Sequence, residues 1–246
     1  MTHAFEVPAS AIRIAGLTPF TTIDYPGKLS AVAFIQGCPW QCVYCQNAWM
    51  QSRAFDPTLE HSSWEALVAL LKRRQGLLDA VVFSGGEPCL DPALPAAIAE
   101  VRELGFQVGL HTGGSYPERL KSVLPFIDWV GLDVKAVPDD DAHWTKIVRV
   151  PGASKKWSQS LDYLLASDVA FECRSTVHPD YFSEAQLLAT GEALRRRGVD
   201  TYVLQICRRP PGQCFSLFGN VLDTWPSGET LDALKGKFKT FSVRRA

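Results

Sequence analysis

The sequence predicts an α/β fold with a parallel sheet, and two observations carry that prediction. Six short apolar runs, often β-branched or aromatic, recur along the chain, and amphipathic stretches lie between most of them. Runs that are apolar on both faces are typical of parallel strands covered on both sides. About six strand–helix units then form either a barrel or an open, doubly wound sheet, and both place ligands at the carboxyl ends of the strands.

The expected elements alternate in the order strand, helix, strand. Strands are expected at residues 31–35, 80–83, 108–110, 129–132, 169–171 and 202–206. Helix starts are predicted from two capping boxes, Ser62 with Glu65 and Ser183 with Gln186, and from Asp91 followed by Pro92. Gly105 ends the helix after Asp91, Gly198 ends the helix after Ser183, and shorter helices are expected at residues 116–124 and 158–165. The tail is expected to hold a short helix at 229–234 and a strand at 238–243.

The composition is that of one globular domain over residues 1–246. The chain is 46% hydrophobic and 21% charged, enough for a sizeable core. Its 25 basic and 26 acidic side chains give a net charge of −1, which offers no electrostatic reason for nucleic acid or an anionic membrane as the main partner. No run approaches the ~18 apolar residues of a membrane span, and residues 1–15 lack the apolar core of a signal peptide. A cytoplasmic location is expected.

Three of the seven cysteines are grouped in a loop after the first expected strand. At the spacing of Cys38, Cys42 and Cys45, three thiolates can surround one small inorganic centre, an iron–sulfur cluster or zinc. A structural zinc site needs four protein ligands, and the next candidate, His61, is 16 residues beyond Cys45. A four-iron cluster held by three cysteines leaves one iron open, and reduced core thiols are the third alternative. The remaining cysteines are expected to be inert buried thiols: Cys89, Cys173, Cys207 and Cys214.

A second motif, Ser84-Gly85-Gly86-Glu87-Pro88, follows the second expected strand. It is therefore expected at the same edge of the sheet as the cysteine loop. Two glycines allow a ligand to approach the backbone closely, and Glu87 supplies a negative charge suited to an ammonium group. On its own, the glycine pair also fits a turn that needs positive φ.

The cysteine pattern, with Tyr44 in its aromatic slot, and the Gly-Gly-Glu-Pro turn together resemble the radical S-adenosylmethionine (SAM) superfamily. The resemblance covers about residues 12–207 and implies a partial (β/α)6 TIM-like barrel at about 12–215, with a short C-terminal extension at about 216–246. It implies that the three cysteines hold a [4Fe–4S] cluster whose open iron binds the amine and carboxylate of SAM. The implied cofactor contacts are Tyr44, near the adenine, and Gly85, Gly86, Glu87, Thr112, Asp133 and Lys135. On this basis, Gly86→Val is expected to weaken SAM binding and to leave the cluster intact.

More of the chain is similar to one branch of the superfamily, the activating enzymes of glycyl radical enzymes. The similar segments are 23–27, 37–38, 45–47, 111–114 and 132–135, and the opening segment 16–29 most resembles anaerobic ribonucleoside-triphosphate reductase activating proteins. The resemblance implies that the reduced cluster cleaves SAM to a 5′-deoxyadenosyl radical, which removes hydrogen from a glycine of a partner enzyme. It also implies an external one-electron donor such as flavodoxin or ferredoxin, and a hydrogen bond between Asp24 and the partner's glycine loop.

The chain departs from that branch at two positions. Gln46 stands where histidine is common, so a titrating role there is lost. His111 stands where related activases have aspartate, which removes a carboxylate from an expected cation site and leaves Asp133 as the candidate. Arg174 and Arg208 are expected near the ends of the fifth and sixth strands, where each either faces the SAM carboxylate or forms an ion pair.

Three functions therefore remain open. The first is a glycyl radical enzyme activase, most closely that of the anaerobic ribonucleotide reductase. Another glycyl radical enzyme is the alternative target of such an activase. The second function is a radical SAM enzyme acting on a small-molecule cofactor precursor, and the third is a non-catalytic metal-binding module. The activase segments favour the first over the second, and uptake of about four irons per chain separates both from a zinc module.

Overall fold

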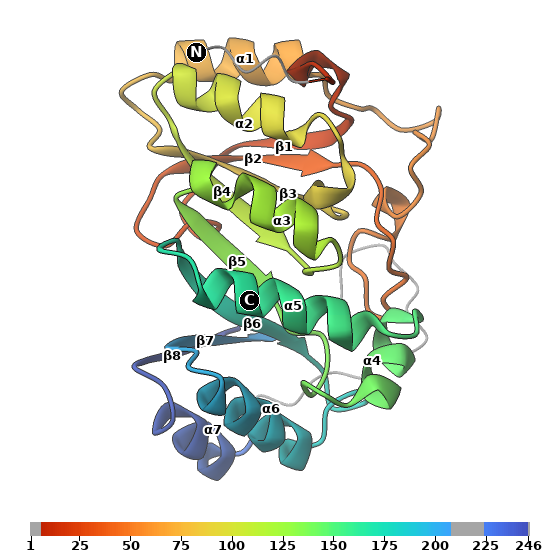
Figure 1. Ribbon diagram of the computed structural model, residues 1–246, viewed down its shortest axis with the longest axis vertical. Helices are drawn as coiled ribbons and strands as arrows, with labels where there is room; N and C mark the ends of the chain where they lie inside the picture. Colours follow the sequence, from red (N-terminus) through yellow and green to blue (C-terminus); the bar gives the residue numbers. More distant parts are fainter. Residues whose placement is uncertain (1–5, 208–223, 246) are drawn as a thin grey trace.

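The computed structural model describes residues 6–207 and 224–245, whose strands form one eight-stranded sheet (Figure 1). The strands are β1 (Ile14–Thr21), β2 (Ser30–Ile35), β3 (Ala80–Gly85), β4 (Gln107–Thr112), β5 (Trp129–Asp133), β6 (Ala170–Val177), β7 (Thr201–Ile206) and β8 (Thr240–Arg244). The helices are α1 (Trp64–Arg73), α2 (Leu94–Glu103), α3 (Pro117–Val123), α4 (Asp141–Val148), α5 (Ala153–Leu165), α6 (Glu184–Arg196) and α7 (Gly228–Lys235). Short 3-10 turns lie at Ala9–Ala11, Ala48–Met50, Pro88–Leu90 and Leu124–Phe126.

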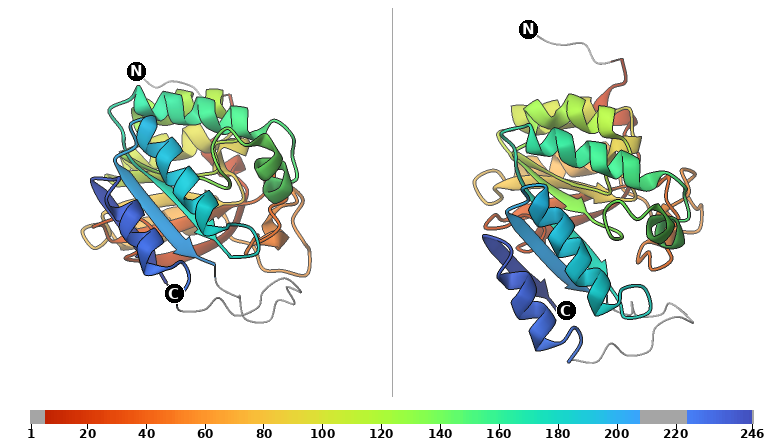
Figure 2. Two further views of the ribbon diagram at one scale, coloured as in Figure 1. Left: turned by 90° about the horizontal axis from the view of Figure 1, so that it is seen from below. Right: turned by 60° about the horizontal axis from the view of Figure 1, so that its bottom comes forward.

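The strands cross the sheet in chain order, from β1 to β8. A doubly wound sheet reverses its strand order in the middle, and this sheet does not. Strands β2 to β8 run parallel, and helices α2, α3, α5 and α6 lie along one face while the sheet curves away from them (Figures 1 and 2). The structure confirms the predicted α/β fold and selects the open, TIM-like partial barrel over the doubly wound sheet.

The sheet extends beyond the predicted strands at both edges. Strand β1 was not expected, because this antiparallel edge strand is only partly buried and lacks a continuous apolar run. At the other edge, α7 and β8 correspond to the helix and strand expected in the tail, but β8 pairs with β7 and adds a further parallel unit to the barrel. Residues 216–223 of the expected extension, with Arg208 and Cys214, lie outside the described residues.

Helix α6 begins as the sequence predicts. The Ser183 side chain accepts the backbone N–H of Gln186, and the Gln186 side chain accepts the backbone N–H of Ser183, so both bonds of the capping box are present. For α1 the predicted capping box is wrong by one residue, because Ser63 is the N-cap and its hydroxyl accepts from Ala66. Local cap patterns therefore located these starts to within one residue.

The start predicted for α2 is displaced for a physical reason. Asp91 does not cap the helix, which begins at Leu94. Its buried carboxylate accepts the backbone N–H groups of Ala93 and Arg13 and pairs with Arg53 at 2.6 Å. The Asp91 carboxylate therefore does not cap α2, because it bonds residues that are distant in the sequence, Arg13 and Arg53.

Helix α4 was missed, and α5 begins at Ala153 rather than near residue 158. The α4 segment is short and holds β-branched residues, so its helix propensity is weak. Tertiary packing stabilises it: buried Trp144 lies 5.5 Å from Trp157 of α5 and 5.8 Å from Trp40, between ring centroids. Because Trp40 belongs to the cysteine loop, α4 supports that loop.

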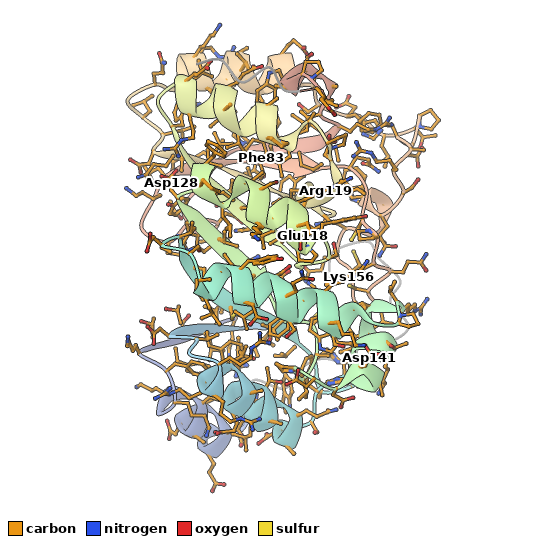
Figure 3. The ribbon with its side chains drawn as sticks, viewed as in Figure 1. Phe83, Glu118, Arg119, Asp128, Asp141 and Lys156 are labelled. Carbon is orange, nitrogen blue, oxygen red and sulfur yellow. The ribbon has the colours of Figure 1, made fainter. Side chains whose placement is uncertain are left out.

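The two faces of the sheet differ: the predicted runs are apolar on both faces, but the strands continue beyond these runs with polar side chains on the inner face. Facing the helices, residues such as Phe83 and Leu110 are fully buried, and charged Glu118 and Lys156 lie on the exposed helix surfaces (Figure 3). Inside the barrel, a small apolar cluster fills the amino ends of the strands: Tyr25, Val32, Ala80, Val82 and Trp129. Polar side chains occupy the carboxyl ends. In residues 6–207 and 224–245, no helix is long and apolar enough to cross a membrane.

Candidate active site

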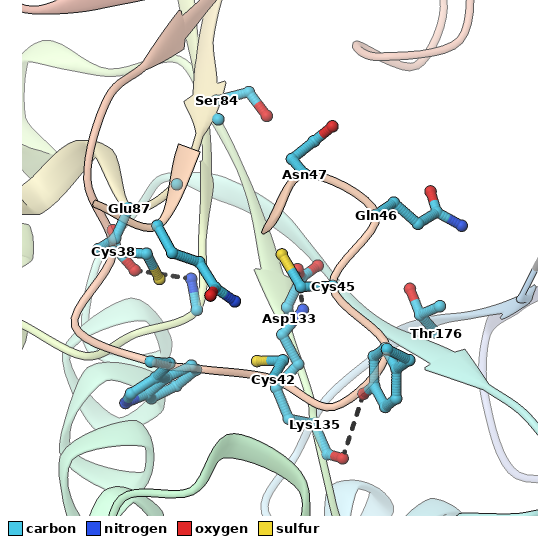
Figure 4. Close-up of a pocket in the computed structure, with 16 residues that line it drawn as sticks. Cys38, Cys42, Cys45, Gln46, Asn47, Ser84, Glu87, Asp133, Lys135 and Thr176 are labelled. Carbon is cyan, nitrogen blue, oxygen red and sulfur yellow. Dashed lines mark hydrogen bonds and ion pairs between the residues drawn. The ribbon is translucent and has the colours of Figure 1, made fainter. Parts of the chain in front are cut away.

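A cavity of about 200 Å³ lies where β2, β3 and β5 end (Figure 4). The register pairs Ile35 of β2 with Gly85 of β3, so the cysteine loop and the glycine turn lie side by side as predicted. Of the ten predicted site residues, nine line the cavity: Cys38, Cys42, Tyr44, Cys45, Gly85, Gly86, Glu87, Asp133 and Lys135. The tenth, Thr112, does not line it. The sequence also missed Gln51 and Thr176, which do.

The backbone of the cysteine loop is fixed at both ends. Gly37 and Cys38 donate their N–H groups to the carbonyls of Met50 and Gln51, at 2.8 and 3.0 Å. The N–H groups of Gln41 and Val43 bond carbonyls in the last turn of α4 at 3.1 and 3.0 Å. These are carbonyls that a helix end leaves without internal partners, so α4 and the loop satisfy each other.

The three thiols fit the role of cluster ligands. Figure 4 places the sulfurs of Cys38, Cys42 and Cys45 around the cavity. Burial raises the pKa of Cys38 to about 12 and that of Cys42 to about 11, so both thiols are protonated unless a cation stabilises the thiolate, as bound iron does. Within the described residues no three potential ligands converge on a single metal ion. A four-iron cluster places each cysteine on a separate iron, and this donor set suits it.

The glycine turn is pressed against the cysteine loop. Gly85 has φ of 111°, a conformation that favours glycine. A Cβ on Gly86 would overlap the carbonyl oxygen of Gly37, directly before Cys38. A side chain added at Gly86 would displace the backbone that carries the first cysteine, so Gly86→Val is expected to disturb the cluster as well as SAM binding.

The Glu87 carboxylate joins the glycine turn to the end of β4. One oxygen accepts from the Thr112 hydroxyl at 2.7 Å and the Cys89 N–H at 3.1 Å; the other accepts from the Gly113 N–H at 2.9 Å and the Ser115 hydroxyl at 3.3 Å. Burial raises the pKa of Glu87, and these four donors favour its ionised form. Thr112 thus supports the cavity through Glu87 and does not face it.

Asp133, Lys135 and Arg174 form a compact charged group beside the cysteines. Asp133 accepts from Lys135 Nζ at 2.8 Å and from Arg174 Nη2 at 2.9 Å. Although burial alone raises the pKa of Asp133, the two cations hold it well below its usual range. Arg174 lies inside β6 and not at its end, and its guanidinium occupies the space above Gly131 where a Cβ would lie. Of the two roles expected for Arg174, the structure supplies the ion pair.

Tyr44 and Gln46 frame the cavity on the side of β7. The Tyr44 ring is buried 5.7 Å from that of Tyr181, and its hydroxyl lies 3.5 Å from the Lys135 carbonyl oxygen. The Gln46 side chain hydrogen-bonds Cys207, which follows β7. As expected, Cys89, Cys173 and Cys207 are buried free thiols.

His111 stands where the resemblance implies an aspartate of a cation site, and its ring nitrogens contact other groups instead. Its Nε2 lies 2.8 Å from the Asp24 carbonyl oxygen and its Nδ1 3.3 Å from the Ser84 hydroxyl. Removal from water and the nearby Arg174 lower the pKa of His111 to about 3, so the ring is neutral. The Asp133 carboxylate is already balanced by two side-chain cations, and the Asp24 carboxylate accepts from Thr21 at 2.7 Å.

A second cavity, of about 510 Å³, adjoins the first at the open side of the barrel. Both are lined by Gln46 and Thr176, which therefore mark their junction. The segment after β1 forms one wall, and the ends of β7 and β8 form the other. The remaining lining residues are Thr22, Ile23, Pro26, Gln205, Ile206, Val243, Arg244 and Arg245.

Known proteins share both the sequence pattern and the fold. The family model of the radical SAM superfamily matches residues 32–206. A Methanocaldococcus jannaschii protein, provisionally named a glycyl-radical enzyme activating enzyme, is 31% identical over 198 residues, 78% of each chain. The pyruvate formate-lyase-activating enzyme of Staphylococcus aureus is 32% identical over 136 residues, which are 50% of this chain and 52% of that one.

Solved structures extend the likeness in fold. The crystal structure of Streptococcus suis SuiB bound to S-adenosylmethionine superposes with a TM-score of 0.65 at 11% identity, over 86% of this chain and 49% of that one. The chain thus spans about half the length of SuiB and of the S. aureus enzyme. The family model covers well over half of the chain and includes the cysteine loop and the glycine turn. The chain belongs to the radical SAM superfamily.

Proposed function

We propose that this protein is an activating enzyme that removes a hydrogen atom from a glycine of a partner enzyme. The observation that carries the proposal is the junction of the two cavities at Gln46 and Thr176. In this proposal an extended protein segment enters from the open side of the barrel, occupies the second cavity and passes Gln46 and Thr176 to the cofactor site. The similarity along 78% of both chains to a protein provisionally named as such an activating enzyme supports it.

In this proposal Cys38, Cys42 and Cys45 hold a [4Fe–4S] cluster with SAM at its open iron. When bound and reduced by an external donor such as flavodoxin or ferredoxin, the cluster supplies the electron that cleaves SAM. The chain's own residues bind and orient SAM. The backbone of Gly85 and Gly86 receives the SAM ammonium group beside the Glu87 charge.

The charged group formed by Asp133, Lys135 and Arg174, beside the cysteines, is suited to the carboxylate of SAM. Lys135, Asp133 and Arg174 together carry one excess positive charge, which favours a carboxylate. Tyr44 offers a buried aromatic ring for the adenine. Thr112 acts through Glu87, whose carboxylate it helps to hold.

We further propose the anaerobic ribonucleoside-triphosphate reductase as the partner and the cytoplasm as the location. The segment 16–29 that resembles activators of this reductase includes Thr22, Ile23 and Pro26. These residues form one wall of the second cavity, where a partner loop would enter. The resemblance therefore falls on a surface that the partner would contact.

Anaerobic radical transfer tests the proposal. The reconstituted protein, SAM, a reductant and the reductase are expected to give a glycine-centred doublet in the electron paramagnetic resonance spectrum. Replacement of the reductase glycine by alanine should remove the signal. A doublet with a different glycyl radical enzyme would keep the activity and replace the partner. Brisk SAM cleavage with no doublet in any such enzyme would favour a small-molecule substrate.

A further inference from the structure

The loop between β1 and β2 presents its cavity-lining residues to solvent, and its hydrogen bonds lie mostly at its two ends, between Thr21 and both Ile23 and Asp24 and between Leu29 and Asp79. Thr22, Ile23 and Pro26, which line the second cavity, are exposed, and Ile23 is 68% exposed. The packed residue of this loop is Tyr25, whose ring stacks on Trp129 at 5.1 Å between centroids. Tyr25 fixes the loop to the amino half of the barrel interior and leaves the cavity-lining residues to be positioned by other contacts.

His111 supplies such a contact from the centre of the barrel. A carbonyl oxygen only accepts hydrogen bonds, so the contact at 2.8 Å to the Asp24 carbonyl requires the hydrogen on Nε2. In the neutral ring, Nδ1 is then an acceptor, and the Ser84 hydroxyl at 3.3 Å donates to it. One fixed tautomer therefore joins Ser84, a wall of the first cavity, to the loop that walls the second.

We propose that His111 is a positioning residue for the substrate: it holds the loop 22–27 at a set distance from the SAM site. The inference rests on the proposed function. His111 lines neither cavity, and both of its ring nitrogens are engaged. It therefore acts through the loop, and its removal should misplace the hydrogen donor while SAM still binds. Even a small misplacement of reacting groups lowers the rate strongly.

The test compares three variants with the parent, each reconstituted with its cluster. His111→Ala removes both bonds, and His111→Gln keeps an amide N–H that reaches the Asp24 carbonyl. His61→Ala is the matched control, because His61 Nε2 makes the same kind of contact, at 2.8 Å, with the Asp56 carbonyl of a loop outside both cavities. The probe substrate is the anaerobic ribonucleoside-triphosphate reductase.

Three quantities are measured: the SAM dissociation constant, the glycyl radicals formed per SAM cleaved, and hydrogen exchange over residues 22–28, including the Lys28 amide bonded to the Tyr25 carbonyl at 3.1 Å. For His111→Ala we expect unchanged SAM binding, about tenfold fewer radicals per SAM cleaved and faster exchange in the loop. His111→Gln should restore most of the radical yield, and His61→Ala should match the parent.

Three outcomes would overturn the inference. Unchanged exchange in His111→Ala would mean that the histidine does not hold the loop. Faster exchange with an undiminished radical yield would mean that His111 stabilises the loop but does not position the substrate. Loss of SAM binding or of iron in His111→Ala would mean that His111 belongs to the cofactor site. A parent protein that forms no glycyl radical with any partner would instead refute the proposed function, while the exchange result would still decide whether His111 fixes the loop.

Discussion

The two faces of the barrel sheet carry different kinds of side chain: apolar residues face the helices, and polar residues of the candidate site face the interior. On β4, Val108 and Leu110 face the helices and are fully buried, whereas His111 faces the interior and bonds two polar partners. On β6, Cys173 is buried under the helices while its neighbour Arg174 pairs with Asp133 inside. Alternation along a strand thus separates residues that stabilise the fold from residues that form the site.

The interior itself changes along the strands. Its amino half is closed by apolar side chains around Trp129, and its carboxyl half carries ion pairs and hydrogen-bonding groups. Arg174, for example, is almost completely buried and pairs with Asp133 at the end of β5 at 2.9 Å. Changes to the carboxyl half of the interior should therefore alter the chemistry of the site, with or without a cost in stability, whereas changes to the outer face should alter stability alone.

The largest contrast is expected between two cysteines. Cys42→Ala removes a proposed cluster ligand, so cluster content and SAM cleavage should be lost completely. Cys173→Ala removes a buried thiol on the outer face and should cost about 1 kcal/mol of stability with iron content and cleavage unchanged. Iron and sulfide analysis with a SAM cleavage assay distinguishes them. Full cleavage by the Cys42→Ala protein would refute the ligand assignment.

A smaller but still large effect is expected from Asp133→Asn. The neutral amide leaves Lys135 and Arg174 facing each other without the charge that balances them. Removing one partner from a mostly buried charged group costs about 3 kcal/mol. Denaturant unfolding at neutral pH measures this loss, and the SAM dissociation constant should rise because the two cations are no longer held in place. An unchanged free energy of unfolding would show that the group contributes little.

The pH dependence of that difference has a definite sign. The pKa of Asp133 is lowered in the folded protein from its usual value of 3.8, so its stabilisation is complete above that value. It is lost as the pH falls toward the folded pKa. The stability gap between the parent and Asp133→Asn should therefore be constant from pH 7 to about pH 5 and close only below about pH 4. A gap that closes near pH 6 would contradict the assignment to Asp133.

The sequence predicted the outer face better than the inner one, and β6 shows why. Its expected strand stopped at residue 171, where Glu172, Arg174 and Thr176 begin to interrupt the apolar run. These side chains find their partners on other strands, between 29 and 72 residues away, and no local pattern indicates such a partner. The cysteine loop and the glycine turn were predicted because each is a contiguous motif at a strand end. Thr176 was missed because it is recognised only once β6 is extended and its inward face is known.

The outer face should respond in stability alone. Leu110 is fully buried between β4 and the helices, and its neighbour His111 faces the interior. Leu110→Ala should lower the free energy of unfolding by about 2 to 5 kcal/mol, through lost burial and the cavity left behind. SAM binding by the folded protein should stay within about twofold of the parent. A tenfold weaker SAM affinity would mean that the two faces are coupled through the strand.

The smallest effect is expected at the junction of the two cavities. Gln46 stands where the resemblance to activating enzymes implies a histidine, and here its side chain hydrogen-bonds Cys207. A histidine at this position also carries a donor and an acceptor in its neutral form, so Gln46→His can keep a polar contact at the junction. We expect SAM cleavage and radical yield within about threefold of the parent.

Kinetics at several pH values test this expectation. A new titration of the activity between pH 6 and 7, seen in the Gln46→His variant alone, would show that the histidine ring faces the reacting groups. A loss of more than about tenfold at every pH would instead mean that the junction is shaped for an amide.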